Sequence, residues 1–192
     1  MANSIRGKEM HTNIGILDFC YENSLITVVA NRNFAEMKLA GLNVGPFDEG
    51  NEYQVHYWIA KELQATGTVH LREEEVLDGS KLYKVQWKEG IQIPGMISEL
   101  PQEFYPKLRR LLTFAEAEAV QPEKIQEYHK VKALAKDITN SRLKKIIALS
   151  AASTQSDQIL KKLTTEERII YEQLGKIIST WKNQILQKQE KQ

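Results

Sequence analysis

Glycine is distributed very unevenly along this chain of 192 residues, and that asymmetry constrains the fold more than any other feature. Nine of the ten glycines precede residue 97, and Gly175 is the exception. Because glycine marks turns and its absence permits long helices, the second half can be continuously helical while the first half turns often.

Charge divides at the same place. Residues 1–96 hold 9 basic and 13 acidic residues, a net charge of −4, and residues 97–192 hold 17 and 12, a net charge of +5. We therefore expect two modules with different partners.

The composition excludes several classes of protein. Hydrophobic residues make up 42% and charged residues 27%, as in an ordinary soluble globular chain. No apolar run approaches the roughly 20 residues that a membrane span needs, and residues 1–10 lack the apolar core of a secretory signal. Cys20 is the single cysteine, so neither an intrachain disulfide nor a thiolate cluster for zinc is possible.

The first half predicts a small β-rich domain with one helix. β-Branched and alternating apolar segments indicate strands, and the run of apolar residues at spacings of four around Ile59 indicates the helix. The expected elements are, in order, strands at 25–30 and 37–42, a turn-rich loop at 41–50, a helix at 51–65 that stops at Gly67, strands at 68–72 and 82–87, and a linker at 90–95.

The second half predicts helices only. Pro101 and Pro122 are each expected to occupy the first position of a helix. Apolar residues recur at helical spacing from Ile125 to Leu149, which indicates one long helix or two that meet near residues 139–141. Thr164 or Thr165 with Glu167 resembles a capping box for the last helix. The apolar stripe of that helix is Ile170, Leu174, Ile177, Trp181 and Ile185. The predicted fold is thus α+β, with a β-rich domain at 1–92 and a helical bundle at 97–192.

Few residues could support catalysis or bind a metal. The glycines of the 41–50 loop are not followed by the Lys-Ser or Lys-Thr pair of a phosphate-binding loop, and the four histidines are scattered. Cys20 lies among apolar residues and is expected to be a buried structural thiol rather than a nucleophile. Glu73, Glu74 and Glu75 are expected to be solvated surface. No catalytic residue, cofactor or metal is predicted, and a small enzyme using Cys20 or the glutamate run is the least favoured alternative.

Basic residues on the long helix raise a nucleic-acid hypothesis. Lys132, Lys136, Lys144 and Lys145 could neutralise phosphates. The near-zero net charge of the whole chain argues against a dedicated DNA-binding protein. We expect DNA contact to be weak or indirect, and an adaptor that binds nucleic acid through these helices is the alternative function.

The helical half carries more apolar surface than three or four helices readily hide. Paired isoleucines at 169–170 and 177–178 widen the apolar face of the last helix, which favours packing on two sides, one of them against a partner. A self-sufficient bundle is the alternative. Arg142 falls in an apolar register, so we expect a buried ion pair or hydrogen bond there, in an internal strut or at an interface. The candidate partner-interface residues are Tyr105, Arg109, Arg142, Ile170, Ile178 and Trp181.

Several segments, in their order and spacing, resemble the GINS family, and in particular the type whose eukaryotic members are "partner of Sld-five" two and three. The segments are Leu25-Ile-Thr-Val-Val29, the Gly45-Pro46-Phe47 loop, Tyr57-Trp58-Ile59-Ala60, Leu100-Pro-Gln-Glu-Phe-Tyr105, and Asp137 to Ile146 with Arg142 and Lys145 inside it. The likeness covers nearly the whole chain. His56 stands where the family has proline, and Val69 to Trp87 looks like an added β-hairpin. Both departures suggest an archaeal member.

The resemblance implies a β-rich domain followed by a helical domain, and a non-catalytic role in DNA replication. It implies assembly with a sister GINS subunit in a hetero-oligomer, expected to be a heterotetramer of two subunit types. It further implies bridging of the MCM helicase and a Cdc45 or RecJ-like partner at the replication fork. The expected location is cytoplasmic and nucleoid-associated, or nuclear in a eukaryote, with no membrane partner. Tyr57 and Trp58 are expected in the core of the small domain.

Overall fold

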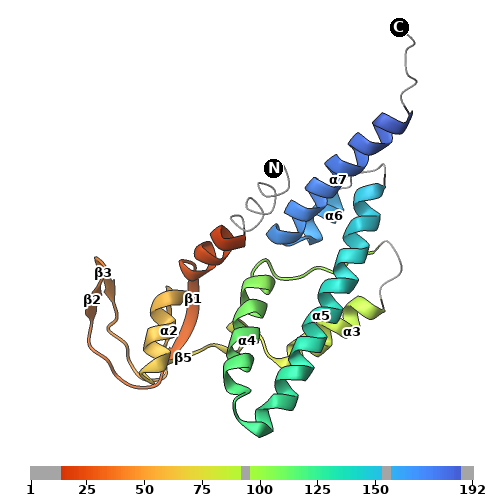
Figure 1. The fold of residues 1–192 in the computed structure, drawn as a ribbon. Helices are drawn as coiled ribbons and strands as arrows, with labels where there is room; N and C mark the ends of the chain where they lie inside the picture. The colour runs from red at the N-terminus through yellow and green to blue at the C-terminus, as the bar shows by residue number, and fades with distance from the viewer. Residues whose placement is uncertain (1–13, 92–95, 153–156, 187–192) are drawn as a thin grey trace, which may run out of the picture. The chain divides into compact units, whose positions relative to one another are not determined.

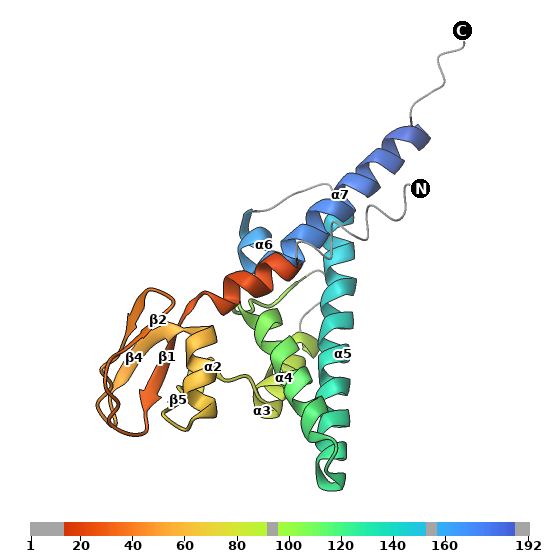
Figure 2. The same cartoon turned by 60° about the vertical axis from the view of Figure 1, so that its left-hand side comes forward.

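The computed structural model describes residues 14–91, 96–152 and 157–186 (Figures 1 and 2). The chain is α+β, with a small β-rich part followed by a helical part, as the sequence predicts. It forms two compact units that divide between Leu77 and Asp78. Residues 1–10, which are predicted to lack a secretory signal, and most of the linker expected at 90–95 lie outside the described residues.

The first unit is a three-stranded antiparallel sheet with one helix packed on it. Strand β1 is central, in the order β4-β1-β5, and β2 and β3 form a separate hairpin. Residues 14–22 are helical. The elements that follow are β1 (Leu25–Ala30), β2 (Met37–Leu39), β3 (Leu42–Val44), β4 (Glu52–His56), α2 (Tyr57–Ala65), β5 (Val69–Leu71) and the 3-10 helix η1 (Glu73–Glu75).

The core of the first unit lies between the sheet, α2 and the loop that follows β3. Val28 of β1, Phe47 of the loop and Ile59 of α2 are almost fully buried within it. Tyr57 and Trp58 pack against this core while remaining partly exposed, so they belong to the core as predicted but lie at its edge.

Three expectations for the first unit are corrected. The strand expected at 37–42 is a hairpin, because Ala40 and Gly41 both adopt positive φ and reverse the chain in the manner of a two-residue hairpin turn. The helix expected from residue 51 begins at Tyr57, since Glu52–His56 pairs with β1 as strand β4. Cys20 is exposed rather than buried, because it lies on the outward face of the helical residues 14–22 while Tyr21 faces inward.

Gly45 shapes the loop that carries Phe47 into the core. Its φ is +92°, and a Cβ added there would lie 3.2 Å from Cδ2 of Phe47 and 3.4 Å from Cα of Glu36. Phe47 also pairs with Phe34 through two backbone hydrogen bonds of 2.8 Å, so the ring has little room to retreat. The position therefore requires glycine both for its backbone conformation and for its space.

We predict that Gly45→Ala lowers the free energy of unfolding of the first unit by about 2 kcal/mol or more, from a left-handed backbone cost plus a steric clash. Gly50→Ala is the matched control, because Gly50 also has a positive φ of +83° but nothing lies within 4 Å of an added Cβ. Urea unfolding followed by Trp58 fluorescence, with Trp87 and Trp181 changed to Phe, measures both. Equal losses in the two variants would contradict the steric argument.

The second unit is built around one long helix. Its elements are α3 (Gly79–Gly90), α4 (Phe104–Glu118), α5 (Pro122–Ala151), α6 (Asp157–Lys162) and α7 (Thr165–Leu186). Helices α3, α4 and α7 each pack on α5, which is continuous through residues 139–141 (Figures 1 and 2). Pro122 occupies the first position of α5 as predicted, whereas α4 begins at Phe104, three residues after Pro101.

The strand expected at 82–87 is wrong, because this segment lies in helix α3. Asp78 caps the helix by accepting a 2.8 Å hydrogen bond from the backbone N–H of Lys81. Leu82 and Glu89, seven residues apart, are buried on the face that packs on α5. Residues 78–91 thus pack with the helical unit, so the compact units divide earlier than the boundary expected at 92–97.

Candidate protein-interaction surface

A buried ionic network joins the helices of the second unit. Arg142 of α5 is fully buried and forms ion pairs with two carboxylates, Glu89 of α3 and Glu167 of α7, each only 2% exposed. The guanidinium donates from Nε and Nη2 to Glu167 at 2.5 and 2.6 Å, and from Nη1 to Glu89 at 2.6 Å. Nη1 also donates to the carbonyl oxygen of Ser98 at 2.6 Å. The buried ion pair predicted for Arg142 is therefore confirmed.

Two further side chains complete the network. Lys145 Nζ donates to Glu89 Oε2 at 2.6 Å, and the phenol of Tyr105 donates to Glu167 Oε1 at 2.8 Å. Glu167 also forms the predicted capping box, in which its carboxylate accepts from the N–H of Thr164 and its own N–H donates to the Thr164 hydroxyl. Two cations thus face two anions, and among the described residues no buried side-chain N or O atom lacks a hydrogen-bond partner.

The electrostatics of the network keep the carboxylate of Glu89 ionised. Burial alone would raise the pKa of Glu89, but hydrogen bonds from Lys145 and Ser98 and the charge of Arg142 hold that pKa below its ordinary value. Burial, and then the negative charge of Glu167, raise the pKa of Tyr105, so its phenol stays protonated and donates. Helices α3, α4, α5 and α7 are thereby held in one register, and Arg142 and Tyr105 are internal struts of this unit.

We predict that Glu167→Ala lowers the free energy of unfolding of the helical unit by about 3–5 kcal/mol, because Arg142 would lose half of its buried partners and α7 its cap. Glu172→Ala is the control, since Glu172 lies on the exposed side of the same helix and should change stability by less than about 0.5 kcal/mol. Thermal unfolding by circular dichroism compares them. Similar melting temperatures for the two variants would refute the role of the network.

The lowered pKa of Glu89 predicts a pH dependence. A carboxylate whose folded pKa lies below its unfolded value, 4.5 here, stabilises the fold above that value and loses the contribution as the pH falls through the folded pKa. The stability advantage of the wild type over Glu89→Gln should therefore be constant from pH 7 to about pH 5 and shrink below pH 4.5. Melting temperatures of the wild type and Glu89→Gln, measured between pH 7 and pH 4, test the direction of the change. A stability advantage of the wild type that grows on acidification would contradict the prediction.

The apolar stripe of α7 continues beyond the part of the helix that is packed. Tyr171 is buried, and Ile170 and Leu174 pack against a core cluster that includes Ile146 and Leu149 of α5. Further along the same stripe, Ile177, Trp181 and Ile185 are 54, 60 and 65% exposed. Figures 1 and 2 show α7 running past the end of α5. We call these three residues the α7 apolar extension.

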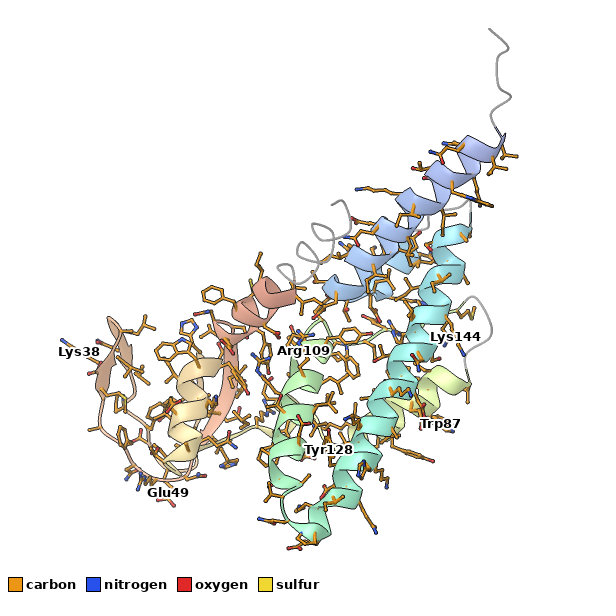
Figure 3. All side chains as sticks on the ribbon, in the orientation of Figure 1. Lys38, Glu49, Trp87, Arg109, Tyr128 and Lys144 are labelled. Carbon is orange, nitrogen blue, oxygen red and sulfur yellow. The ribbon has the colours of Figure 1, made fainter. Side chains whose placement is uncertain are left out.

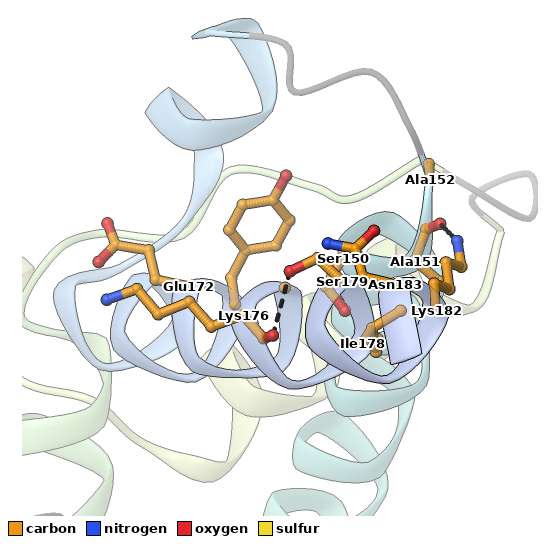
Figure 4. Close-up of a pocket in the computed structure, with 11 residues that line it drawn as sticks. Ser150, Ala151, Ala152, Glu172, Lys176, Ile178, Ser179, Lys182 and Asn183 are labelled. Atoms are coloured by element: carbon orange, nitrogen blue, oxygen red, sulfur yellow. Dashed lines mark hydrogen bonds between the residues drawn. The ribbon is translucent and has the colours of Figure 1, made fainter. Parts of the chain in front are cut away.

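A groove of about 690 Å³ lies where α7 crosses the end of α5 (Figure 4). It is lined by Tyr171, Glu172, Lys176, Ile178, Lys182 and Asn183 of α7, by their neighbours Gly175 and Ser179, and by residues 150–152. Lys182 Nζ donates to the carbonyl oxygen of Ala151 at 3.0 Å, which ties the two helices at this point. Among the residues that the structure describes, no group of three or more His, Cys, Asp or Glu could hold a metal ion.

The remaining candidate residues fall into different settings. Arg109 is partly exposed and forms a 3.4 Å ion pair with Glu166, while Ile170 and Ile178 are half-buried along the packed part of α7. Only Trp181 of the predicted interface residues is mainly exposed. Other exposed apolar residues of the second unit include Tyr83 and Trp87 of α3, Ile91 at the C-cap of that helix, and Phe114 of α4.

The four lysines of the nucleic-acid hypothesis do not form one patch. Lys145 is held in the buried network, with a side chain 12% exposed. Lys132 donates to the Tyr128 hydroxyl at 2.8 Å. Lys132 and Lys136 are exposed one turn apart, and Lys144 is exposed two turns further on and turned to another side of the helix.

Comparisons with known proteins match both parts of the chain. Residues 68–186 match the family model described as the GINS complex protein helical bundle domain, and residues 13–71 match the PSF2 N-terminal domain. The chain is similar to the DNA replication complex GINS protein PSF2 of Homo sapiens, at 25% identity over 130 residues, which is 68% of this chain and 66% of the human protein. The match thus spans just under two thirds of the human relative. The frog protein of the same name, from Xenopus laevis, is 26% identical over 137 residues, covering 71% of this chain and 70% of its own.

The exposed apolar residues on the helical unit are typical of a chain that assembles with other proteins. The match of residues 68–186 to the GINS helical bundle domain identifies the family: the chain belongs to the GINS family. Within that family it is of the PSF2 type, because its first unit matches the PSF2 N-terminal domain as well. No described helix is both long and apolar enough to cross a membrane.

Proposed function

We propose that the chain is a non-catalytic subunit of a DNA-replication complex and that the α7 apolar extension binds another GINS subunit. The single observation that carries this proposal is the continuation of the packed α7 stripe into Ile177, Trp181 and Ile185, which are each more than half exposed. Burying large apolar side chains of this kind contributes about 1.5–3 kcal/mol each. Tryptophan is also the residue type most often found at the energetic centre of interfaces.

The rigidity of the helical unit supports the same proposal. The Arg142 network fixes the first half of α7 on α5 through Glu167, so the extension is presented in one direction before any partner binds. A surface that is already ordered loses less conformational entropy on association than a flexible one. Residues Tyr105 and Arg142 act in assembly indirectly, by holding α7 in place.

The finer parts of the proposal rest on the GINS family. We propose a hetero-oligomer of two subunit types, arranged as a heterotetramer, that bridges the MCM helicase and a Cdc45 or RecJ-like partner where DNA is replicated. The presence of two compact units in one chain supports a bridging role, because each unit offers its own surface. In this role the chain works by binding proteins, and nucleic acid contact through Lys132, Lys136 and Lys144 is a secondary alternative.

Co-purification with another GINS subunit of the same source tests the assembly. We predict that Trp181→Ala with Ile185→Ala weakens the complex at least tenfold, since two large apolar side chains leave the interface. Phe114→Ala is the matched control, because Phe114 is equally exposed, at 61%, but lies on α4. Size-exclusion chromatography with light scattering and calorimetric titration measure the outcome. A wild-type chain that remains a monomer in the presence of the other subunit would refute the proposal.

A further inference from the structure

Helix α3 carries a second exposed stripe, separate from the α7 apolar extension. Tyr83, Trp87 and Ile91 recur every four residues and are 57, 61 and 59% exposed. Tyr83 and Trp87 lie away from the buried Leu82 and Glu89, Ile91 follows at the C-cap of α3, and more than half of each of the three is exposed in the described part of the chain. Figure 3 labels Trp87 on α3. We call these three residues the α3 stripe.

The α3 stripe has the composition of a binding surface. Tyr and Trp combine large contact area with few rotatable bonds, and both are enriched where partners contribute most binding energy. From Tyr83 to Ile91 the stripe runs about 12 Å along the helix, at the usual rise of about 1.5 Å per residue. That length corresponds to two turns of a partner helix lying alongside it.

The charged side chains that α3 itself places beside the stripe are both basic. Lys84 and Lys88 each follow an aromatic residue of the stripe, are exposed, and form no ion pair or side-chain hydrogen bond within the described part of the chain. The two carboxylates of this segment are turned elsewhere, since Asp78 caps the helix and Glu89 is buried against Arg142. The rim that α3 itself supplies is therefore cationic.

Helix α5 contributes one carboxylate, Asp137, and one ammonium group, Lys144, next to the stripe. Gln86 donates to Asp137 at 3.1 Å, which shows that this side of α5 meets the side of α3 next to the stripe. Lys144 is exposed two turns after Asp137 and so falls on the same side of α5. Figure 3 shows Lys144 and Trp87 on the same side of α5 in that view.

We propose that the α3 stripe binds an acidic amphipathic helix of a partner protein, with apolar residues one turn apart on the stripe and Asp or Glu side chains on Lys84, Lys88 and Lys144. Charge complementarity identifies the occupant, because Lys84, Lys88 and Lys144 outnumber the one carboxylate beside the stripe, Asp137, and the net positive charge favours acidic segments. The aliphatic Ile91 continues the stripe. Aliphatic side chains extend a helix-binding surface but offer no stacking platform for bases, so a protein segment fits better than single-stranded nucleic acid.

This surface lies on a different helix from the α7 apolar extension. A variant of the α3 stripe should therefore still bind another GINS subunit, and a variant of the α7 apolar extension should still bind an acidic peptide. The two proposals are tested separately.

A selection of random 16-residue displayed peptides against the full chain tests the chemistry of the occupant. The library is first depleted on the Tyr83→Ala, Trp87→Ala double variant, which should fold normally because both side chains are mainly exposed. We expect enrichment of peptides with a net charge of −3 or lower and apolar residues at i and i+4. No enrichment, or enrichment of neutral or basic peptides, would overturn the proposal.

Fluorescence anisotropy of the most enriched peptide then assigns the residues. Affinity should fall at least tenfold for Tyr83→Ala with Trp87→Ala, and at least tenfold for Lys84→Glu with Lys88→Glu, whereas Lys132→Glu with Lys136→Glu should change it less than twofold. A peptide with its acids replaced by lysine should prefer the Lys84→Glu, Lys88→Glu protein. Equal losses in both lysine variants would overturn the assignment. A second result would also overturn the assignment. If a 30-nucleotide oligothymidylate displaces the peptide, and Trp87→Ala abolishes binding of the oligonucleotide, the α3 stripe is a nucleic-acid site.

Discussion

The ion pairs of Arg142 are the interaction on which the helical unit depends. A guanidinium with no solvent contact is tolerated only if its charge is paired and its N–H groups are hydrogen-bonded. Removal of one partner from a buried ion pair lowers the free energy of unfolding by about 3–5 kcal/mol. Glu89 and Glu167 satisfy it from two helices, α3 and α7, that lie far apart in the sequence. No helix of this set can shift along α5 without breaking a buried charge pair, so the network selects one arrangement of the bundle.

This constraint explains why apolar surface remains exposed at both sides of α5. On α7 the network and the capping box hold the first turns, and the stripe then continues into Ile177, Trp181 and Ile185, which are each more than half exposed. On α3 the network buries Glu89 and turns Tyr83 and Trp87 outward. A bundle free to adjust could rotate either helix to cover these residues, but rotation would expose or separate the buried charges. The fold therefore presents two apolar surfaces as a consequence of how it is held together.

The sequence predicted the parts of this arrangement that depend on local chemistry. Arg142 in an apolar register and Glu167 three residues after Thr164 each indicate a specific bond, and both bonds are present. The sequence of α3 resembles a strand because Leu82, Val85 and Trp87 partly alternate with polar residues, and the local signal that indicates a helix instead is the capping residue Asp78. The pairing of Lys145 with Glu89 joins residues 56 positions apart, and no local pattern contains it. Apolar spacing, from which the interface candidates are predicted, cannot separate the half-buried Ile178 from the exposed Trp181 on the same helix.

The placement of α3 also changes the meaning of the charge asymmetry. Divided at Leu77, the first unit holds 6 basic and 11 acidic residues and the second holds 20 and 14, so the net charges are −5 and +6 rather than −4 and +5. The lysines of α3 belong to the basic unit, and two of them border the α3 stripe. Within that unit the α7 apolar extension is an uncharged stripe, suited to association through apolar packing, while the α3 stripe combines aromatic area with a cationic rim. Apolar area gives affinity, and the sign of the surrounding charge discriminates between partners, so the two proposed surfaces suit partners of different chemistry.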